Sequence, residues 1–243
     1  MTLRPWNQLP IDDRGEALEA LPGTLLRLEP HPYQSLGAPY GAAGGPFQLR
    51  QSVVDRLLQA QQHLQHQHPE LRLAIFDGWR SLAVQAFMVE HAIAETCRQR
   101  GLDPGLPGAG RDRVVAEVGR FWAPPNPDPA APPPHSTGAA VDLTLAELLT
   151  GRPLAMGSAI DTIGPVSEPD HWLHRAVGCS DGEQRRGYLR WHRHRCWLRE
   201  AMARAGFSQH PNEWWHFSWG DQLWAWQQGH PTAHYGRVEA GDS

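Results

Sequence analysis

Residues 134–145 read PHSTGAAVDLTL, and the rest of the chain is organised around this stretch. It carries an imidazole, His135, and a carboxylate, Asp142, seven residues apart, with Gly138 in a turn between them. From residue 139 onward apolar side chains alternate, which is typical of a strand with one buried face, so Asp142 points away from the apolar side. We interpret this stretch as half of a metal site.

The other half is predicted about seventy residues later, in the segment NEWWHF, where His216 follows Glu213 by three positions. Catalytic zinc ions commonly have three protein ligands from His, Asp or Glu and keep the fourth position for water. We therefore expect His135, Asp142 and His216 as ligands and Glu213 as the general base. Residues three apart face opposite sides of a strand, so Glu213 has to precede the regular strand or lie at a bulge.

The remaining pattern predicts a scaffold of alternating helices and strands in one domain over residues 1–243. Helices are expected over 52–66, 81–100, 114–121 and 188–205, and β segments over 71–76, 138–145 and 207–219. Residues 1–50 should be irregular with at most short strands around residues 25–28, 101–134 should hold a Pro-rich surface insertion, and 154–187 should form a loop that covers a site. After Gly220 no clear pattern is seen.

Composition excludes several classes of function. A net charge of -4 leaves no basic surface for nucleic acid. No stretch approaches eighteen consecutive apolar residues, and acidic residues interrupt the first thirty, so neither a membrane span nor a signal peptide is expected. Three widely spaced cysteines indicate ordinary thiols in a reducing compartment, and we expect a cytoplasmic protein. The oligomeric state stays open.

Other histidines give weaker patterns. His63, His66 and His68 fall near the end of a polar helix and favour a solvated face. The pairs 171/174 and 192/194 have no carboxylate at a useful spacing in the sequence. No HExxH, GxSxG, P-loop or GxGxxG pattern occurs. These observations leave the first cluster as the candidate site.

Arg80 ends the segment DGWR, directly after a predicted strand. Taken alone, it favours a surface ion pair with Asp77 or Glu90. A fixed guanidinium beside a zinc site has a second use, because it stabilises the oxyanion that develops when water attacks an amide carbonyl.

Four segments together resemble, in chain order, the motifs of the D-alanyl-D-alanine dipeptidases. They are DGWR at 77–80, HSTGAAVDLTL at 135–145, MGSAID at 156–161 and EWWH at 213–216. These dipeptidases are zinc enzymes related to the D-Ala-D-Ala carboxypeptidases and to the hedgehog signalling domain. The resemblance implies an α+β fold, in which a small antiparallel sheet is flanked by helices and one zinc ion per chain lies in a cleft.

The resemblance also implies residue roles beyond the three zinc ligands. It makes Glu213 both general base and general acid, and Arg80 the stabiliser of the tetrahedral intermediate. Asp161 becomes the partner of the substrate's ammonium group, and Tyr33 a substrate-contacting tyrosine. The family usually has Ser two residues before the first zinc histidine, where Pro133 stands in this chain.

The expected function is therefore hydrolysis of a small dipeptide, D-alanyl-D-alanine, by a metal-activated water, in peptidoglycan-precursor turnover or nutrient salvage. Two alternatives stay open. One is a related zinc D,D- or L,D-carboxypeptidase acting on longer cell-wall peptides. The other is a non-catalytic zinc-stabilised binding domain, which Glu213 and Arg80 disfavour because a structural metal requires neither.

Overall fold

A five-stranded sheet with the order β2-β4-β5-β7-β6 forms the centre of the computed structural model, which describes residues 4–41 and 44–238. The strands are β2 (Leu26–Arg27), β4 (Leu71–Asp77), β5 (Ala140–Glu147), β6 (Ser208–Gln209) and β7 (His216–Ser218). Neighbours are antiparallel except β2, which joins β4 in parallel at one edge. Residues 1–3 and 42–43 of the segment expected to be irregular, and 239–243, lie outside the described residues.

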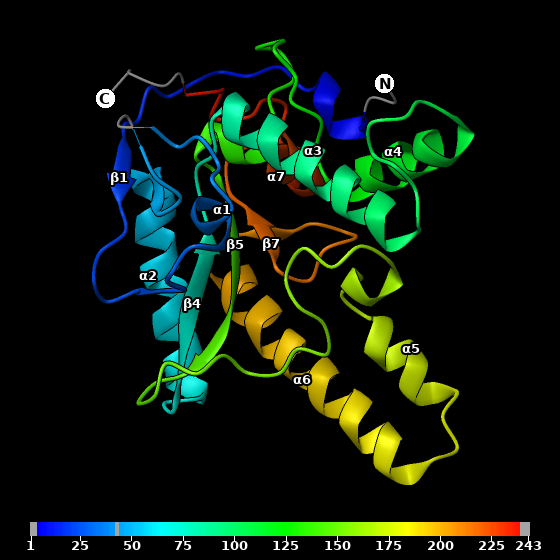
Figure 1. Ribbon diagram of the computed structural model, residues 1–243. Coiled ribbons are helices and arrows are strands. Elements are labelled where there is room, and N and C mark those ends of the chain that lie inside the picture. Colours follow the sequence, from blue (N-terminus) through cyan, green and yellow to red (C-terminus); the bar gives the residue numbers. More distant parts are fainter. Residues whose placement is uncertain (1–3, 42–43, 239–243) are drawn as a thin grey trace.

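Helices cover both faces of this sheet (Figure 1). On one face lie α2 (Gln51–Gln67) and α6 (Gly182–Arg204); on the other lie α1 (Pro32–Ser35), α3 (Leu82–Gln99) and α4 (Ala109–Phe121). The chain also forms β1 (Leu18–Ala20), β3 (Gln48–Arg50), α5 (His171–Val177) and α7 (Gln222–Gln228), and the 3-10 turns η1 (Pro5–Gln8), η2 (Pro134–Thr137) and η3 (Pro165–Ser167). The predicted α+β class is confirmed, with β2 as a parallel addition to the expected antiparallel sheet.

The two faces of β5 separate the core from the polar site. Val141, Leu143 and Leu145 are completely buried against α2 and α6. Because side chains alternate along a strand, Asp142 faces the opposite side. Asp142 is paired in register with Asp77 of β4 and His216 of β7, so three neighbouring strands bring polar side chains to one place.

Several helices differ from the sequence expectation. The segment expected to be irregular contains α1, and α4 begins at Ala109 instead of residue 114. The helix expected from residue 188 begins at Gly182, where the Asp181 side chain accepts hydrogen bonds from the backbone of Glu183 and Gln184. The expected covering loop contains α5, and the tail that shows no clear pattern contains α7. Within residues 4–41 and 44–238 no helix is both long and apolar enough to cross a membrane.

The Pro-rich segment crosses the surface without helix or strand between α4 and η2. Its Ala130 carbonyl accepts a hydrogen bond from Gln222 Nε2 at 2.9 Å, and the same amide donates to the Leu9 carbonyl at 2.6 Å. One side chain of α7 therefore ties the N-terminal segment to the Pro-rich segment beside the sheet.

Candidate metal centre

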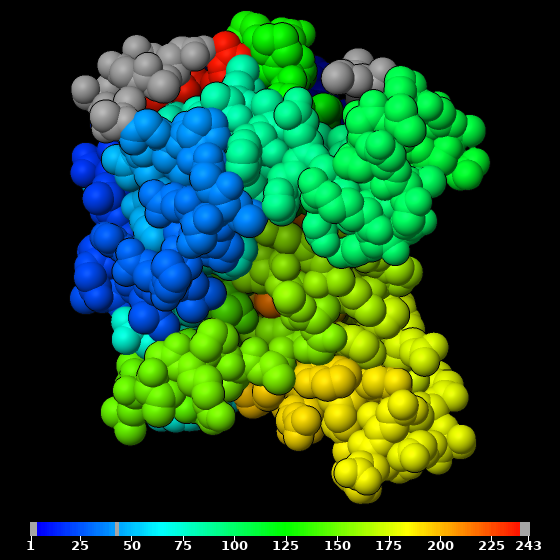
Figure 2. Space-filling model, viewed as in Figure 1, coloured from blue at the N-terminus to red at the C-terminus, as the bar shows by residue number. Residues whose placement is uncertain are grey.

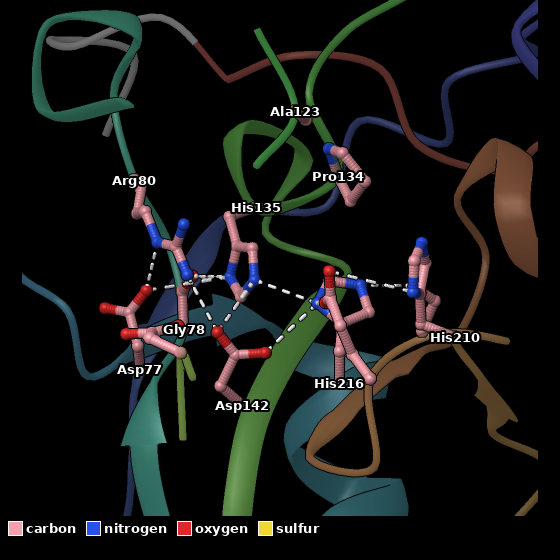
Figure 3. Close-up of polar contacts among 12 residues, drawn as sticks. Asp77, Gly78, Arg80, Ala123, Pro134, His135, Asp142, His210 and His216 are labelled. Atoms are coloured by element: carbon pink, nitrogen blue, oxygen red, sulfur yellow. Dashed lines mark hydrogen bonds and ion pairs between the residues drawn. The ribbon is translucent and has the colours of Figure 1, made fainter. Parts of the chain in front are cut away.

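The side chains of His135, Asp142 and His216 converge at one point (Figure 3). His135 Nε2 lies 3.2 Å from Asp142 Oδ2, and His216 Nδ1 lies 3.0 Å from Asp142 Oδ1. The two imidazole nitrogens are 3.2 Å apart. All three residues are buried, and within the described part of the chain this is the one group of three or more such side chains with the spacing of a metal site.

The orientation of His135 fits a metal ligand. Its Nδ1 donates to the Gly78 carbonyl at 2.6 Å, so in the neutral ring the lone pair of Nε2 points into the cluster. Metal-binding histidines are usually fixed in this way through the other ring nitrogen. Gly78 is needed there, because a Cβ would lie 2.8 Å from the Pro46 carbonyl oxygen. Two imidazoles and a carboxylate form a donor set that suits zinc.

Asp142 keeps its charge in this buried place. Burial alone would raise its pKa, but His135 and His216 hold the pKa of Asp142 well below its ordinary value. Arg80 Nη2 also donates to Asp142 Oδ2 at 2.7 Å. The carboxylate is thus ionised and held in position by these partners.

Glu213 lies in the turn before β7, as the strand geometry required. Its carboxyl oxygens are 3.7 Å from His216 Nδ1 and 3.7 Å from His210 Nδ1. Burial, and next the charge of Asp142, raise the pKa of Glu213 to about 8. This carboxyl therefore exchanges a proton near neutral pH, which suits proton transfer.

Arg80 is held by a buried network rather than by a surface ion pair. Its Nε donates to Asp77 at the end of β4, and its Nη1 reaches Gln85 Oε1 at 3.3 Å. The pairing of β4 with β5 has a register shift between Ile75 and Asp77, so the regular strand is interrupted just before Arg80. Three of the five guanidinium N–H groups of Arg80 have protein partners, including the bond to Asp142, and the other two have none among residues 4–41 and 44–238.

Asp161 lies at the Arg80 side of the cluster. It accepts a hydrogen bond of 2.5 Å from Tyr33, whose ring lies 5.1 Å from the Arg80 guanidinium. Burial, and next the charge of Asp142, raise the pKa of Asp161 to about 7. The loop that carries Asp161 is fixed by Arg195, which donates to the carbonyls of Met156, Val166 and Glu168.

Two adjoining spaces surround these groups. A small cavity of about 40 Å³ lies against the triad and is lined by Arg80, Asp161 and Glu213 among others. A larger cleft of about 580 Å³ shares Trp122 and Asp161 with it and extends between α1, α3, α4 and residues 160–163, segments that meet on the face shown in Figure 2. Tyr33 lines this second cleft, so it reaches the cavity only through Asp161.

Sequence reasoning overlooked Arg4 and His210, which also line the small cavity. His210 precedes Glu213 by three positions, and this spacing was the available signal. Arg4 has no such signal. Of the discounted histidines, His192 does have a carboxylate nearby in space, since Asp170 lies 3.8 Å from it at the start of α5. His192 and Asp170 are far apart in the sequence, so their spacing gave no sign of this contact.

The chain matches one family by sequence. Residues 27–234 match the family model described as D-Ala-D-Ala dipeptidase. A D-alanyl-D-alanine dipeptidase from Synechocystis sp. is 42% identical over 245 residues, which cover 98% of this chain and 98% of the relative. Another, from Streptomyces coelicolor, is 39% identical over 84 residues, 35% of each chain. Among solved structures, a D,D-pentapeptidase of vancomycin resistance in complex with zinc has a TM-score of 0.46 at 13% identity, over 92% of this chain and 95% of that one.

Proposed function

This chain belongs to the family of D-Ala-D-Ala dipeptidases, and from that premise we propose that it hydrolyses D-alanyl-D-alanine at one zinc ion held by His135, Asp142 and His216. The observation that carries the proposal is the convergence of three buried ligand atoms within 4.8 Å of one another, beside a carboxyl that is not a ligand. A site that only stabilised the fold would not need Glu213.

The zinc ion would acidify a water molecule, polarise the scissile carbonyl and, as a nearby positive charge, favour the ionised form of Glu213. Glu213 accepts the proton of the attacking water and then donates it to the nitrogen of the leaving amine. Its carboxyl lies 3.7 Å from His216 and is not one of the three converging side chains, which supports a role in proton transfer. The same group therefore serves as base and acid.

Arg80 stabilises the negative charge that develops on the carbonyl oxygen. Its two free N–H groups are available for this, and its other three are fixed by Asp77, Asp142 and Gln85. A donor that is already oriented needs no reorganisation when charge develops, which is why such groups contribute strongly to catalysis.

Asp161 binds the ammonium group of the substrate. Its carboxyl lies in the cavity wall, and Tyr33 fixes its orientation through a hydrogen bond. An ammonium group bound by Asp161, in the wall of the same cavity as the triad, would limit how many residues precede the scissile bond. This limit is the feature that makes the proposed enzyme a dipeptidase.

We expect Asp161→Asn to raise KM for D-alanyl-D-alanine about 10- to 100-fold, because one charge-assisted hydrogen bond is lost. Asp161 has a φ of 64°, and Asn is one of the few residues that adopt this backbone conformation readily. Steady-state kinetics on the dipeptide and on its N-acetyl form measure the effect. An unchanged preference for the free amine would contradict the assignment.

A panel of substrates tests the function as a whole. The zinc-loaded protein should cleave D-alanyl-D-alanine and leave tri- and pentapeptides intact, and D-D, L-D and L-L dipeptides define its stereospecificity. The larger cleft beside Asp161 favours the alternative of a carboxypeptidase for longer cell-wall peptides, and cleavage of the pentapeptide would support it. Bound zinc without hydrolysis of any peptide would support a binding domain. The cytoplasmic location and the role in peptidoglycan turnover stay predictions.

A further inference from the structure

Arg4 has an unsatisfied donor next to the site. Its Nη1 donates to His210 Nε2 at 3.3 Å, whereas its buried Nη2 has no hydrogen-bond partner. No carboxylate among residues 4–41 and 44–238 is within ion-pair distance of this guanidinium. Both Arg4 and His210 line the small cavity beside the triad. A buried charged donor without a partner is rare, and its presence in a cavity wall points to a ligand.

The Arg4 side chain is held in place by its surroundings. Its guanidinium lies 5.6 Å from the ring of Trp6, which is buried against His210 and Trp226. Gln222 fixes the following backbone through its bond to the Leu9 carbonyl. Burial lowers the pKa of Arg4, an effect that agrees with removal of the guanidinium from water. Arg4 is thus a positioned cation and not a mobile surface charge.

Arg4 and Asp161 belong to groups of contacts that lie on opposite sides of the metal ligands. Figure 3 shows Arg80 on one side of His135, Asp142 and His216, and His210 on the other. Asp161 is bonded to Tyr33, which lies against Arg80, whereas Arg4 is bonded to His210. The wall of the cavity therefore includes both a carboxylate, Asp161, and a cation with a free donor, Arg4.

We propose that Arg4 binds the C-terminal carboxylate of the substrate, so that the site requires peptides with a free C-terminus. This inference rests on the proposed hydrolysis of a dipeptide, which carries an ammonium group at one end and a carboxylate at the other. Arg4 lies on the side of Glu213, where the leaving amine receives its proton, and that amine belongs to the C-terminal residue. Arginine is the side chain best suited to a planar carboxylate.

The test compares D-alanyl-D-alanine with its C-terminal amide. The wild-type protein should prefer the free acid, and Arg4→Met should lower kcat/KM for the acid about 10- to 100-fold while cleavage of the amide is retained. Loss of Arg4 also changes the charge around Glu213, but that change affects both substrates alike. The ratio between the two substrates therefore isolates the contact with the carboxylate. Arg4→Lys should restore part of the preference.

Arg14→Met is the matched control, because Arg14 is exposed, is bonded to His234 and does not line the cavity. Equal losses on acid and amide after Arg4→Met would overturn the inference and leave Arg4 only a support for His210. Titration of D-alanine and D-alaninamide into the zinc-loaded proteins gives a second readout, in which Arg4→Met should remove the preference for D-alanine. If wild type cleaves no dipeptide, the proposed function fails, and this titration still decides the role of Arg4.

Discussion

Glu213→Gln is expected to lower kcat for D-alanyl-D-alanine by about 10²- to 10⁴-fold while one zinc ion per chain is retained. Gln has nearly the same shape as Glu but cannot accept a proton from water. Glu213 lies 3.7 Å from His216 and is not among the three converging ligand atoms, so the metal site should survive the change. Steady-state kinetics and metal analysis of the same preparation measure the two quantities.

The comparison variant is Glu200→Gln, since Glu200 forms an exposed ion pair with Arg204 on α6. It should leave both turnover and zinc content unchanged. Glu213→Gln with near-normal turnover would show that another group moves the proton. Loss of zinc together with activity would instead make Glu213 a ligand or a support for one.

Much of the scaffold was predictable because local signals and tertiary contacts agree there. Ser81 accepts a hydrogen bond from the Val84 backbone at 3.2 Å, and this cap starts α3 where the helix over 81–100 was expected to begin. Along β5 the alternation of Val141 with Asp142 agrees with the burial of one face and the polar site on the other. Where the local signal and the tertiary contacts favour the same residue at a position, the sequence pattern predicts the secondary structure.

The short helices were missed for a physical reason. α5 and α7 have seven residues each, too few for periodicity to be visible. Trp172 of α5 packs against Tyr188 and Trp191 of α6, so this helix depends on a tertiary aromatic contact. For α7 a local signal did exist, because the Asp221 side chain accepts a hydrogen bond from the Trp224 backbone.

In the candidate site, too, only residues that are close along the chain could be recognised from the sequence. The spacing of His135 with Asp142 and of Glu213 with His216 is short, so it can be read from the chain. Arg4 meets His210 across 206 positions, and no pattern in the intervening sequence encodes that contact. Long-range partners of this kind appear only when the fold is known.

The second large effect is expected for Asp142→Asn, which should prevent zinc binding and reduce hydrolysis more than about 10³-fold. Changes to groups that only support metal ligands typically cost about 10- to 100-fold in metal affinity, and loss of a ligand should cost more. Asn keeps the shape of Asp142 but removes the charge that both imidazoles and Arg80 contact. Because Arg80 retains Asp77, its own charge stays paired and the fold should survive.

Thermal unfolding with and without zinc separates loss of the metal from loss of the fold. A ligand that binds only the native state stabilises it by about 2.7 kcal/mol at one hundred times its Kd, so zinc should raise the Tm of the wild-type protein. The Tm of Asp142→Asn should not respond to zinc, whereas Asp128→Asn, a change in the exposed Pro-rich segment, should respond as wild type does. If Asp142→Asn still bound one zinc ion and showed the full shift in Tm, Asp142 would not be a ligand. The proposed metal site, including the ligand roles of His135 and His216 and the position of Arg80 beside them, would then have to be revised.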